Sequence, residues 1–155
     1  MSVDNYKIKF MREACLLCDK SKCLYKVGCL AVCHSKVVLT AFNETLPGER
    51  YCQGEECIRQ RLGLSGGEEI DKVCTIHAEA NLIAKAAARG ISLRNTDIYL
   101  TTFPCYICSK SLVQAQIGKL FYMSDYADND GMRFFEAAGI PVVQIEEAVV
   151  WKDTL

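Results

Sequence analysis

Residues 97–117 read "DIYLTTFPCYICSKSLVQAQI", and the change of pattern within this stretch decides the fold. The first six residues are rich in β-branched and aromatic side chains, which predicts a short strand. Pro104 follows, and because proline favours the first position of a helix, we expect a helix from Pro104 to about Ile117. A strand that leads directly into a helix is the repeating unit of an α/β protein.

The same alternation continues on both sides of this unit. Downstream, "KLFYMS" at 119–124 predicts a strand, residues 131–138 predict a helix, and "VVQI" at 142–145 predicts a further strand. Upstream, "TIHAEANLIAKAAARG" at 75–90 has the alanine-rich composition of a helix, and Gly90 is its expected stop. Helices and strands therefore alternate over the second half of the chain.

The N-terminal half begins with a helix expected over residues 5–20. "KVGCLAVCHSKVVLTAFN" then predicts a hairpin with strands at Val27–Cys33 and Val37–Asn43. We therefore expect a three-layer α/β/α fold with a mixed five-stranded sheet, in a single domain over residues 1–155. The polar, glycine-bearing segment 44–73 is expected to be a long loop, and such loops are usually functional or pinned.

The composition limits the class of partner. The chain has 18 Lys and Arg against 19 Asp and Glu, a net charge of -1, so it lacks the basic surface of a nucleic-acid-binding protein. A small-molecule substrate is favoured, and nucleic acid is not. "MSVDNYKIKFMR" at the N-terminus has no apolar signal region, and no apolar run is long enough to span a bilayer, so we expect a soluble, cytoplasmic protein without a membrane partner.

Ten cysteines are many for a chain of this length. Without a secretory signal they are expected as thiols or thiolates rather than disulfides, which makes metal binding the first hypothesis. A Cys-x-x-Cys pair alone fits a redox pair, half of a structural zinc site or a catalytic metal site. A helix that starts at Pro104 places Cys105 and Cys108 on one face of its first turn, so both sulfurs can reach one ion.

His77 supplies a third ligand type, because catalytic zinc sites commonly have three protein ligands and one His with two Cys is an allowed set. Glu79 would then be free to carry protons. Residues two apart on a helix do not share a face, but a metal beyond the N-terminal end of the helix removes this objection. We expect Thr75 to be the N-cap, which places both residues in the first turn.

"HAE" at 77–79 followed by "PCYIC" at 104–108 resembles the zinc-dependent cytidine and deoxycytidylate deaminase superfamily, whose signature is H-x-E followed by P-C-x-x-C. Further blocks, including "KVGCLAV" and "YLTTFPCYICSKSLVQAQIGKLFYMSDY", extend the resemblance over roughly residues 5–145 and favour the deoxycytidylate branch. The resemblance implies hydrolysis of a cytosine nucleotide, dCMP to dUMP with release of ammonia, by a homo-oligomer. It also implies that His77, Cys105 and Cys108 bind Zn²⁺ and that Glu79 is the proton shuttle.

The resemblance also implies substrate contacts. Asn43 would contact the sugar and base, although the family's Gly-Tyr-Asn-Gly turn reads "AFNE" here and both glycines are lost. Phe103 would lie against the pyrimidine ring, Tyr126 would lie near the pocket, and Lys26 would contact a 5′-phosphate. The alternatives are that Asn43 makes local turn hydrogen bonds, that Phe103 is a core aromatic and that Lys26 is solvated.

Three cysteines, Cys52, Cys57 and Cys74, bracket the long segment before "HAE". They suggest a second, structural zinc, which many deoxycytidylate deaminases carry, with Cys23 or His34 as the fourth ligand. The alternative is a set of reduced cysteines packed under a loop.

Two rival functions remain at the level of sequence. One is a deaminase of another nucleoside, a free base or a base within a nucleic acid. The other is a zinc-stabilised binding or regulatory module that keeps the fold without turnover, and it predicts closed four-ligand coordination, whereas the enzyme needs an open position.

Overall fold

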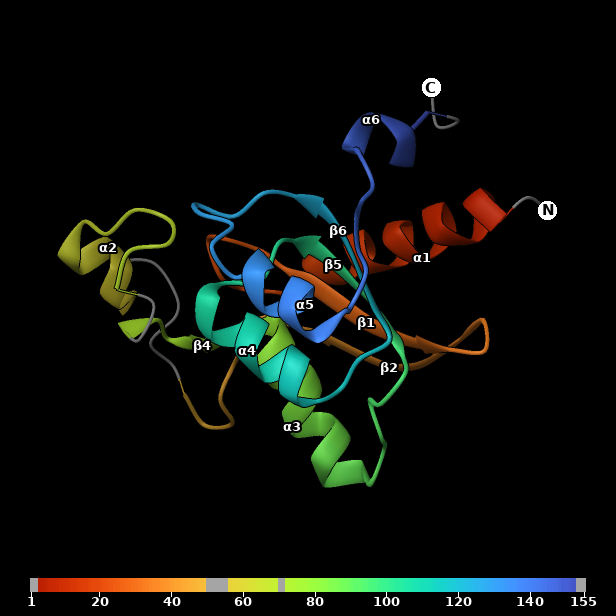
Figure 1. Ribbon diagram of the computed structural model, residues 1–155. Helices are drawn as coiled ribbons and strands as arrows, with labels where there is room; N and C mark the ends of the chain where they lie inside the picture. Colours follow the sequence, from red (N-terminus) through yellow and green to blue (C-terminus); the bar gives the residue numbers. More distant parts are fainter. Residues whose placement is uncertain (1–2, 50–55, 70–71, 153–155) are drawn as a thin grey trace.

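The computed structural model describes residues 3–49, 56–69 and 72–152. A five-stranded sheet in the order β2-β1-β5-β6-β7 forms its centre, with helices on both faces (Figure 1). The strands of this sheet are β1 (Gly28–Cys33), β2 (Lys36–Phe42), β5 (Asp97–Thr102), β6 (Lys119–Ser124) and β7 (Val142–Gln144). The helices are α1 (Val3–Cys18), α2 (Ile58–Leu62), α3 (Ala78–Arg89), α4 (Tyr106–Gln114), α5 (Met132–Ala138) and α6 (Glu147–Val150). A separate two-stranded sheet pairs β3 (Glu44–Thr45) with β4 (Thr75–Ile76).

The sheet is mixed, as predicted. Strand β1 runs antiparallel to both β2 and β5, whereas β5, β6 and β7 are parallel to one another. Parallel neighbours require crossover helices, and α4 and α5 serve as these crossovers. The carboxyl ends of β5, β6 and β2 therefore meet the start of β1 at one edge of the sheet. In open α/β sheets this is the edge at which ligands bind.

Helices cover both faces of the sheet, which confirms the three-layer α/β/α architecture. Leu82 of α3, Leu112 of α4 and Phe135 of α5 are fully buried in the core cluster on one face. On the other face, α1 packs through Met11, and α6 packs through Val150. Within the described ranges, no helix is both long and apolar enough to cross a membrane.

Three details of the sequence interpretation were wrong. Thr75 is not the N-cap of α3, because it pairs with Thr45 in the β3–β4 sheet and its backbone is extended; His77 is the N-cap. Helix α4 begins at Tyr106 rather than at Pro104, with Cys105 as its N-cap. The segment 44–73 contains β3 and the short helix α2, so it is not a structureless loop.

Candidate active site

Three side chains converge at the edge of the sheet where β5 ends. His77 Nδ1 lies 3.5 Å from Cys105 Sγ and 3.6 Å from Cys108 Sγ. All three candidate ligand atoms lie within 4.8 Å of one another, and no other group of three or more His, Cys, Asp or Glu side chains converges in this way among the described residues. The predicted ligand set is therefore brought together by the fold.

Two helix N-termini hold these ligands. His77 is the N-cap of α3, and its carbonyl oxygen accepts a hydrogen bond from the Asn81 N–H at 2.8 Å. Cys105 is the N-cap of α4; its carbonyl accepts from the Ser109 N–H at 2.8 Å, and its Sγ accepts from the Cys108 N–H at 3.5 Å. The positive ends of both helices therefore face one centre, which favours thiolate over thiol.

The observed distances fit zinc. Zn–N bonds of about 2.0 Å and Zn–S bonds of about 2.3 Å, arranged tetrahedrally, separate a nitrogen ligand from a sulfur ligand by about 3.6 Å. The two N···S distances in the structure, 3.5 and 3.6 Å, match this value. His77, Cys105 and Cys108 would therefore hold the ion as a three-ligand set of the kind found in catalytic zinc sites.

Hydrogen bonds among the three ligands change the pKa values of the two cysteine thiols. The hydrogen bond with Cys108, together with that from His77, lowers the pKa of Cys105 to about 4. The same interaction with Cys105 raises the pKa of Cys108, and a hydrogen bond to Cys105 raises the pKa of His77. The thiolate form of Cys105 is therefore favoured at neutral pH, and a divalent cation, when bound, would favour the thiolate form of both residues.

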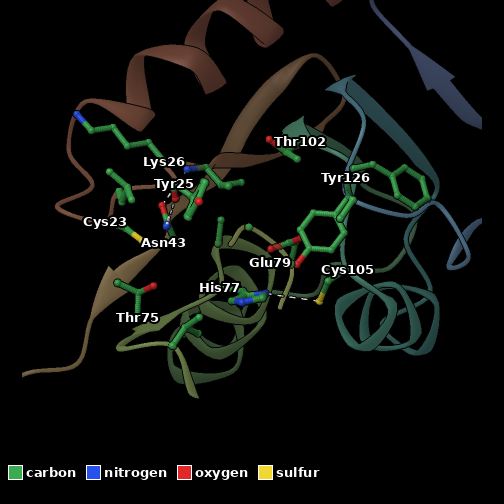
Figure 2. Close-up of a pocket in the computed structure, with 18 of the residues that line it drawn as sticks. Cys23, Tyr25, Lys26, Asn43, Thr75, His77, Glu79, Thr102, Cys105 and Tyr126 are labelled. Carbon is green, nitrogen blue, oxygen red and sulfur yellow. Dashed lines mark hydrogen bonds between the residues drawn. The ribbon is translucent and has the colours of Figure 1, made fainter. Parts of the chain in front are cut away.

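Glu79 lies in the first turn of α3 and is 5% exposed. Burial raises the pKa of its carboxyl to about 7, against the opposing effect of a backbone hydrogen bond and of His77. Figure 2 shows Glu79, His77 and Cys105 facing the same hollow as the Tyr126 ring. A carboxyl group that gains and loses a proton near pH 7 is suited to general acid–base work beside the metal.

A cavity of about 670 Å³ adjoins two of the three ligands, His77 and Cys105. Its volume lies within the range of about 300–1,000 Å³ that is typical of small-molecule sites. Its lining includes His77, Glu79 and Cys105 and all four predicted substrate-binding residues, which are Lys26, Asn43, Phe103 and Tyr126. These four come from different segments that meet at one sheet edge.

Asn43 is buried and is committed to the backbone of the adjacent loop. Its side chain donates to the Tyr25 carbonyl at 2.6 Å and accepts from the Val27 N–H at 2.8 Å (Figure 2). The Ser21 hydroxyl donates to the Asn43 carbonyl at 2.7 Å. Asn43 therefore fixes loop 25–27, which forms one wall of the cavity. The alternative role predicted for Asn43, local hydrogen bonding in a turn, is observed.

The other three predicted substrate residues differ in their surroundings. Phe103 is 1% exposed and packs edge-on against Tyr122 and Phe135, so it is a core aromatic that also borders the cavity. The Tyr126 ring reaches toward Glu79 and Cys105 (Figure 2). The Lys26 side chain is exposed and extends away from His77 and Glu79 (Figure 2).

The predicted second zinc site falls partly outside the described residues, because Cys52 lies in the segment between 49 and 56. Cys23 and Cys57 are buried, and Cys23 borders the cavity. His34 lies in the β1–β2 turn, at the opposite end of β1 from Val27 and the cavity. The second zinc stays a prediction, with Cys23 or His34 as the candidate fourth ligand.

The sequence interpretation missed part of the cavity wall. Arg59 of α2, Tyr25, and the glycine pair Gly66 and Gly67 all line the cavity. The positions of Arg59, Gly66 and Gly67 depend on how segment 56–69 packs against this end of the sheet. The polar, glycine-bearing composition of this segment was a signal for a functional loop, but it did not indicate which residue faces the cavity.

The fold and the site together define a zinc-binding α/β/α domain with a buried carboxyl group at the metal. Residues 4–124 match the family model described as the cytidine and deoxycytidylate deaminase zinc-binding region. The chain therefore belongs to the cytidine and deoxycytidylate deaminase family.

Relatives and solved structures agree with this assignment. ComE operon protein 2 of Bacillus subtilis is 33% identical over 141 residues, which cover 88% of this chain and 69% of that protein. Deoxycytidylate deaminase of Schizosaccharomyces pombe is 32% identical over 92% of this chain, but the match spans only 44% of the yeast protein. The crystal structure of dCMP deaminase from the cyanophage S-TIM5 in complex with dCMP and dUMP is 26% identical, with a TM-score of 0.76 over 94% of this chain and 99% of that chain.

Proposed function

We propose that this protein is a zinc-dependent hydrolase that converts dCMP and water to dUMP and ammonia. The observation that carries the proposal is the buried Glu79 carboxyl in a nucleotide-sized cavity, beside three converging zinc ligands. Family membership and the dCMP/dUMP complex of a similar cyanophage enzyme support the choice of substrate. The activities of the relatives belong to those proteins, and an assay of cytosine compounds tests the deaminase activity of this chain.

Each residue of the site has a role in this reaction. His77, Cys105 and Cys108 would hold the zinc, which when bound acts as a Lewis acid and makes water nucleophilic at neutral pH. Glu79 takes a proton from the attacking water and delivers it to ring N3. It then takes the proton of the new C4 hydroxyl and delivers it to the departing amine, which leaves C4 as a carbonyl. Because the pKa of Glu79 lies near 7, the carboxyl can accept and donate within one cycle.

The cavity walls orient the pyrimidine for this attack. Tyr126 lies on the side of Cys105 and Glu79, and Asn43 holds loop 25–27 on the facing wall. Such fixed walls exclude bulk water and bring C4 to the reacting groups. A base within a long polynucleotide is disfavoured as the substrate, because the chain's net charge of -1 offers no broad basic surface.

The decisive experiment is ammonia release from dCMP by zinc-loaded protein, with deoxycytidine, cytidine and cytosine assayed alongside. Glu79→Gln should keep zinc but lower turnover by at least about 10²-fold, the usual contribution of a general acid–base group. A Glu79→Gln variant with full activity would contradict this mechanism. Zinc-loaded wild type that turns over none of the four compounds would favour the non-catalytic module instead.

The proposal also includes a cytoplasmic homo-oligomer. Light scattering after gel filtration tests assembly, and a single-chain mass would contradict it. A second, structural zinc held by Cys52, Cys57, Cys74 and Cys23 is proposed as well. It predicts two zinc ions per chain by elemental analysis, and one ion after Cys57→Ser.

A further inference from the structure

Arg59 is a buried cation in the wall of the substrate cavity. It belongs to α2, outside the central sheet, and only 5% of its surface is exposed. It borders the same cavity as His77 and Glu79. Arginine is rarely this buried unless its charge is paired. The groups around the Arg59 guanidinium therefore indicate which kind of ligand could bind to it.

Among the described residues, the groups that contact Arg59 are neutral. Nη1 donates to the Glu68 carbonyl at 3.1 Å, Nη2 donates to the Ser65 carbonyl, and the guanidinium lies 5.5 Å from the centre of the Tyr25 ring. Nε is buried and has no hydrogen-bond partner. No carboxylate forms an ion pair with Arg59 within the described part of the chain. A buried cation held by neutral carbonyls is costly unless an anion joins it.

A glycine turn lies beside this cation at the cavity wall. Arg59 holds the turn 65–68 through the two carbonyl contacts, and Gly66 and Gly67 within it border the cavity. A Cβ on Gly66 would lie 3.3 Å from the Tyr25 ring, and one on Gly67 would lie 2.8 Å from Ala127 Cβ. Among the described residues, the N–H groups of Gly66 and Gly67 donate to no backbone carbonyl. With no backbone acceptor in the described part of the chain, these two amides are candidates to bind an anion.

The charge of Arg59 reaches the end of the cavity where His77 lies, because it opposes the rise that a hydrogen bond with Cys105 causes in the pKa of His77. The same charge acts on Tyr126: burial is the main cause that raises the pKa of Tyr126, and Arg59 opposes this rise. Tyr126 in turn lies beside Glu79 and Cys105 (Figure 2). A substrate whose base reaches Glu79 therefore has the cation of α2 within the same cavity. Lys26, the residue expected to bind phosphate, also borders the cavity, but its side chain extends away from His77 and Glu79 (Figure 2).

We propose that Arg59 and the amides of the Gly66–Gly67 turn bind the 5′-phosphate of the substrate and thereby select a nucleoside monophosphate over a nucleoside. This inference rests on the proposed deaminase function. A phosphate dianion would supply a counter-charge that no described residue provides, and the guanidinium is the side chain best suited to bind it. The selectivity is therefore determined by α2 and the following turn rather than by loop 25–27.

The test compares kcat/KM for dCMP and deoxycytidine in zinc-loaded variants. Arg59→Gln should lower kcat/KM for dCMP by about 10- to 100-fold more than it lowers the value for deoxycytidine, as expected for the loss of a hydrogen bond between charged groups. Arg61→Gln is the matched control, because Arg61 is on the same helix, is exposed and lies outside the cavity lining. It should alter neither value by more than about threefold.

A second pair of variants leaves the Arg59 side chain itself in place. Gly66→Asp places a carboxylate at the cavity wall, and Gly66→Asn has nearly the same shape without the charge. Relative to Gly66→Asn, Gly66→Asp should lower the preference for dCMP over deoxycytidine by about tenfold. The same comparison in a Glu79→Gln background, with dissociation constants of dCMP and deoxycytidine measured by calorimetry, gives a readout independent of turnover.

The outcomes separate the two proposals. An equal loss on both substrates in Arg59→Gln, together with identical behaviour of the two Gly66 variants, would show that Arg59 is only structural and would overturn the phosphate role. A dCMP-specific loss in Lys26→Gln but not in Arg59→Gln would overturn it too. If the wild-type protein deaminates no cytosine compound and the Glu79→Gln variant binds none, the proposed function itself fails.

Discussion

The buried carboxyl of Glu79 should make the zinc-free protein less stable as the pH rises, and Glu79→Gln should remove this effect. Burial raises the pKa of Glu79 from 4.5 to about 7 in the folded chain. The folded state therefore holds the proton more tightly than the unfolded state does. Stability is greatest below the unfolded pKa and decreases as the pH rises from about 4.5 to about 7.

The size of this effect follows from the pKa change. One pKa unit corresponds to about 1.4 kcal/mol, so the rise from 4.5 to about 7 corresponds to about 3 kcal/mol of stability. Glutamine has nearly the same shape and no charge. We therefore expect the stability advantage of Glu79→Gln over wild type to grow by about 3 kcal/mol between pH 4 and pH 8.

Urea unfolding of chelator-treated wild type and variant at several pH values measures this difference. Glu44→Gln is the control of opposite sign, because a hydrogen bond to Lys85 lowers the pKa of Glu44 in the folded state. The Glu44 side chain is 41% exposed, and solvent screens its interaction with Lys85. At pH values above about 5, we expect Glu44→Gln to lower the free energy of unfolding by only a few tenths of a kcal/mol. A Glu79→Gln advantage that stays constant from pH 4 to pH 8 would falsify the assignment of a raised pKa to this carboxyl.

Three further variants test the site and the packing around it. Cys105→Ser should lower the zinc content by one ion per chain, and elemental analysis that finds no change would remove Cys105 from the ligand set. Asn43→Ala leaves backbone groups of loop 25–27 without partners, so unfolding experiments should show a loss of about 1–3 kcal/mol; an unchanged free energy of unfolding contradicts this role. Gly28→Ala brings a Cβ within 2.0 Å of the Ala14 carbonyl oxygen, so α1 must shift, and we expect a loss of more than about 2 kcal/mol. A thermal midpoint equal to that of wild type would show that the contact relaxes.

The zinc ligands could be predicted because they occur in two short sequence motifs, each of which is at the start of one helix. Cys105 and Cys108 are separated by one helical turn whatever surrounds them, and His77 and Glu79 lie at the start of one helix. The α/β/α fold was predictable for a similar reason, since periodicity and turn residues report local structure directly. The capping role given to Thr75 failed because a distant segment, β3, pairs with β4 and competes for its backbone.

The substrate cavity was harder to predict because its walls come from segments far apart in the sequence. Lys26 was the only cation with a positional reason to contact phosphate, yet the tertiary structure turns it outward and buries Arg59 instead. Phe103 borders the cavity, but Tyr122 and Phe135 pack against it as a core residue. No local sequence pattern shows whether such a side chain faces the cavity, the core or solvent, because its burial depends on which distant segments pack over it.

The sequence by itself determined the metal chemistry, the family and the layer architecture, because each of these depends on residue types at fixed local spacing. Only the tertiary structure decided which side chains face the substrate. It brings the end of β5, the start of β1, the end of β2 and the α2 segment to one edge of the sheet. It also leaves the Arg59 charge buried without a carboxylate among the described residues. Long-range packing sets both features, and the free energy of a buried charge depends on groups that the linear sequence does not place beside it.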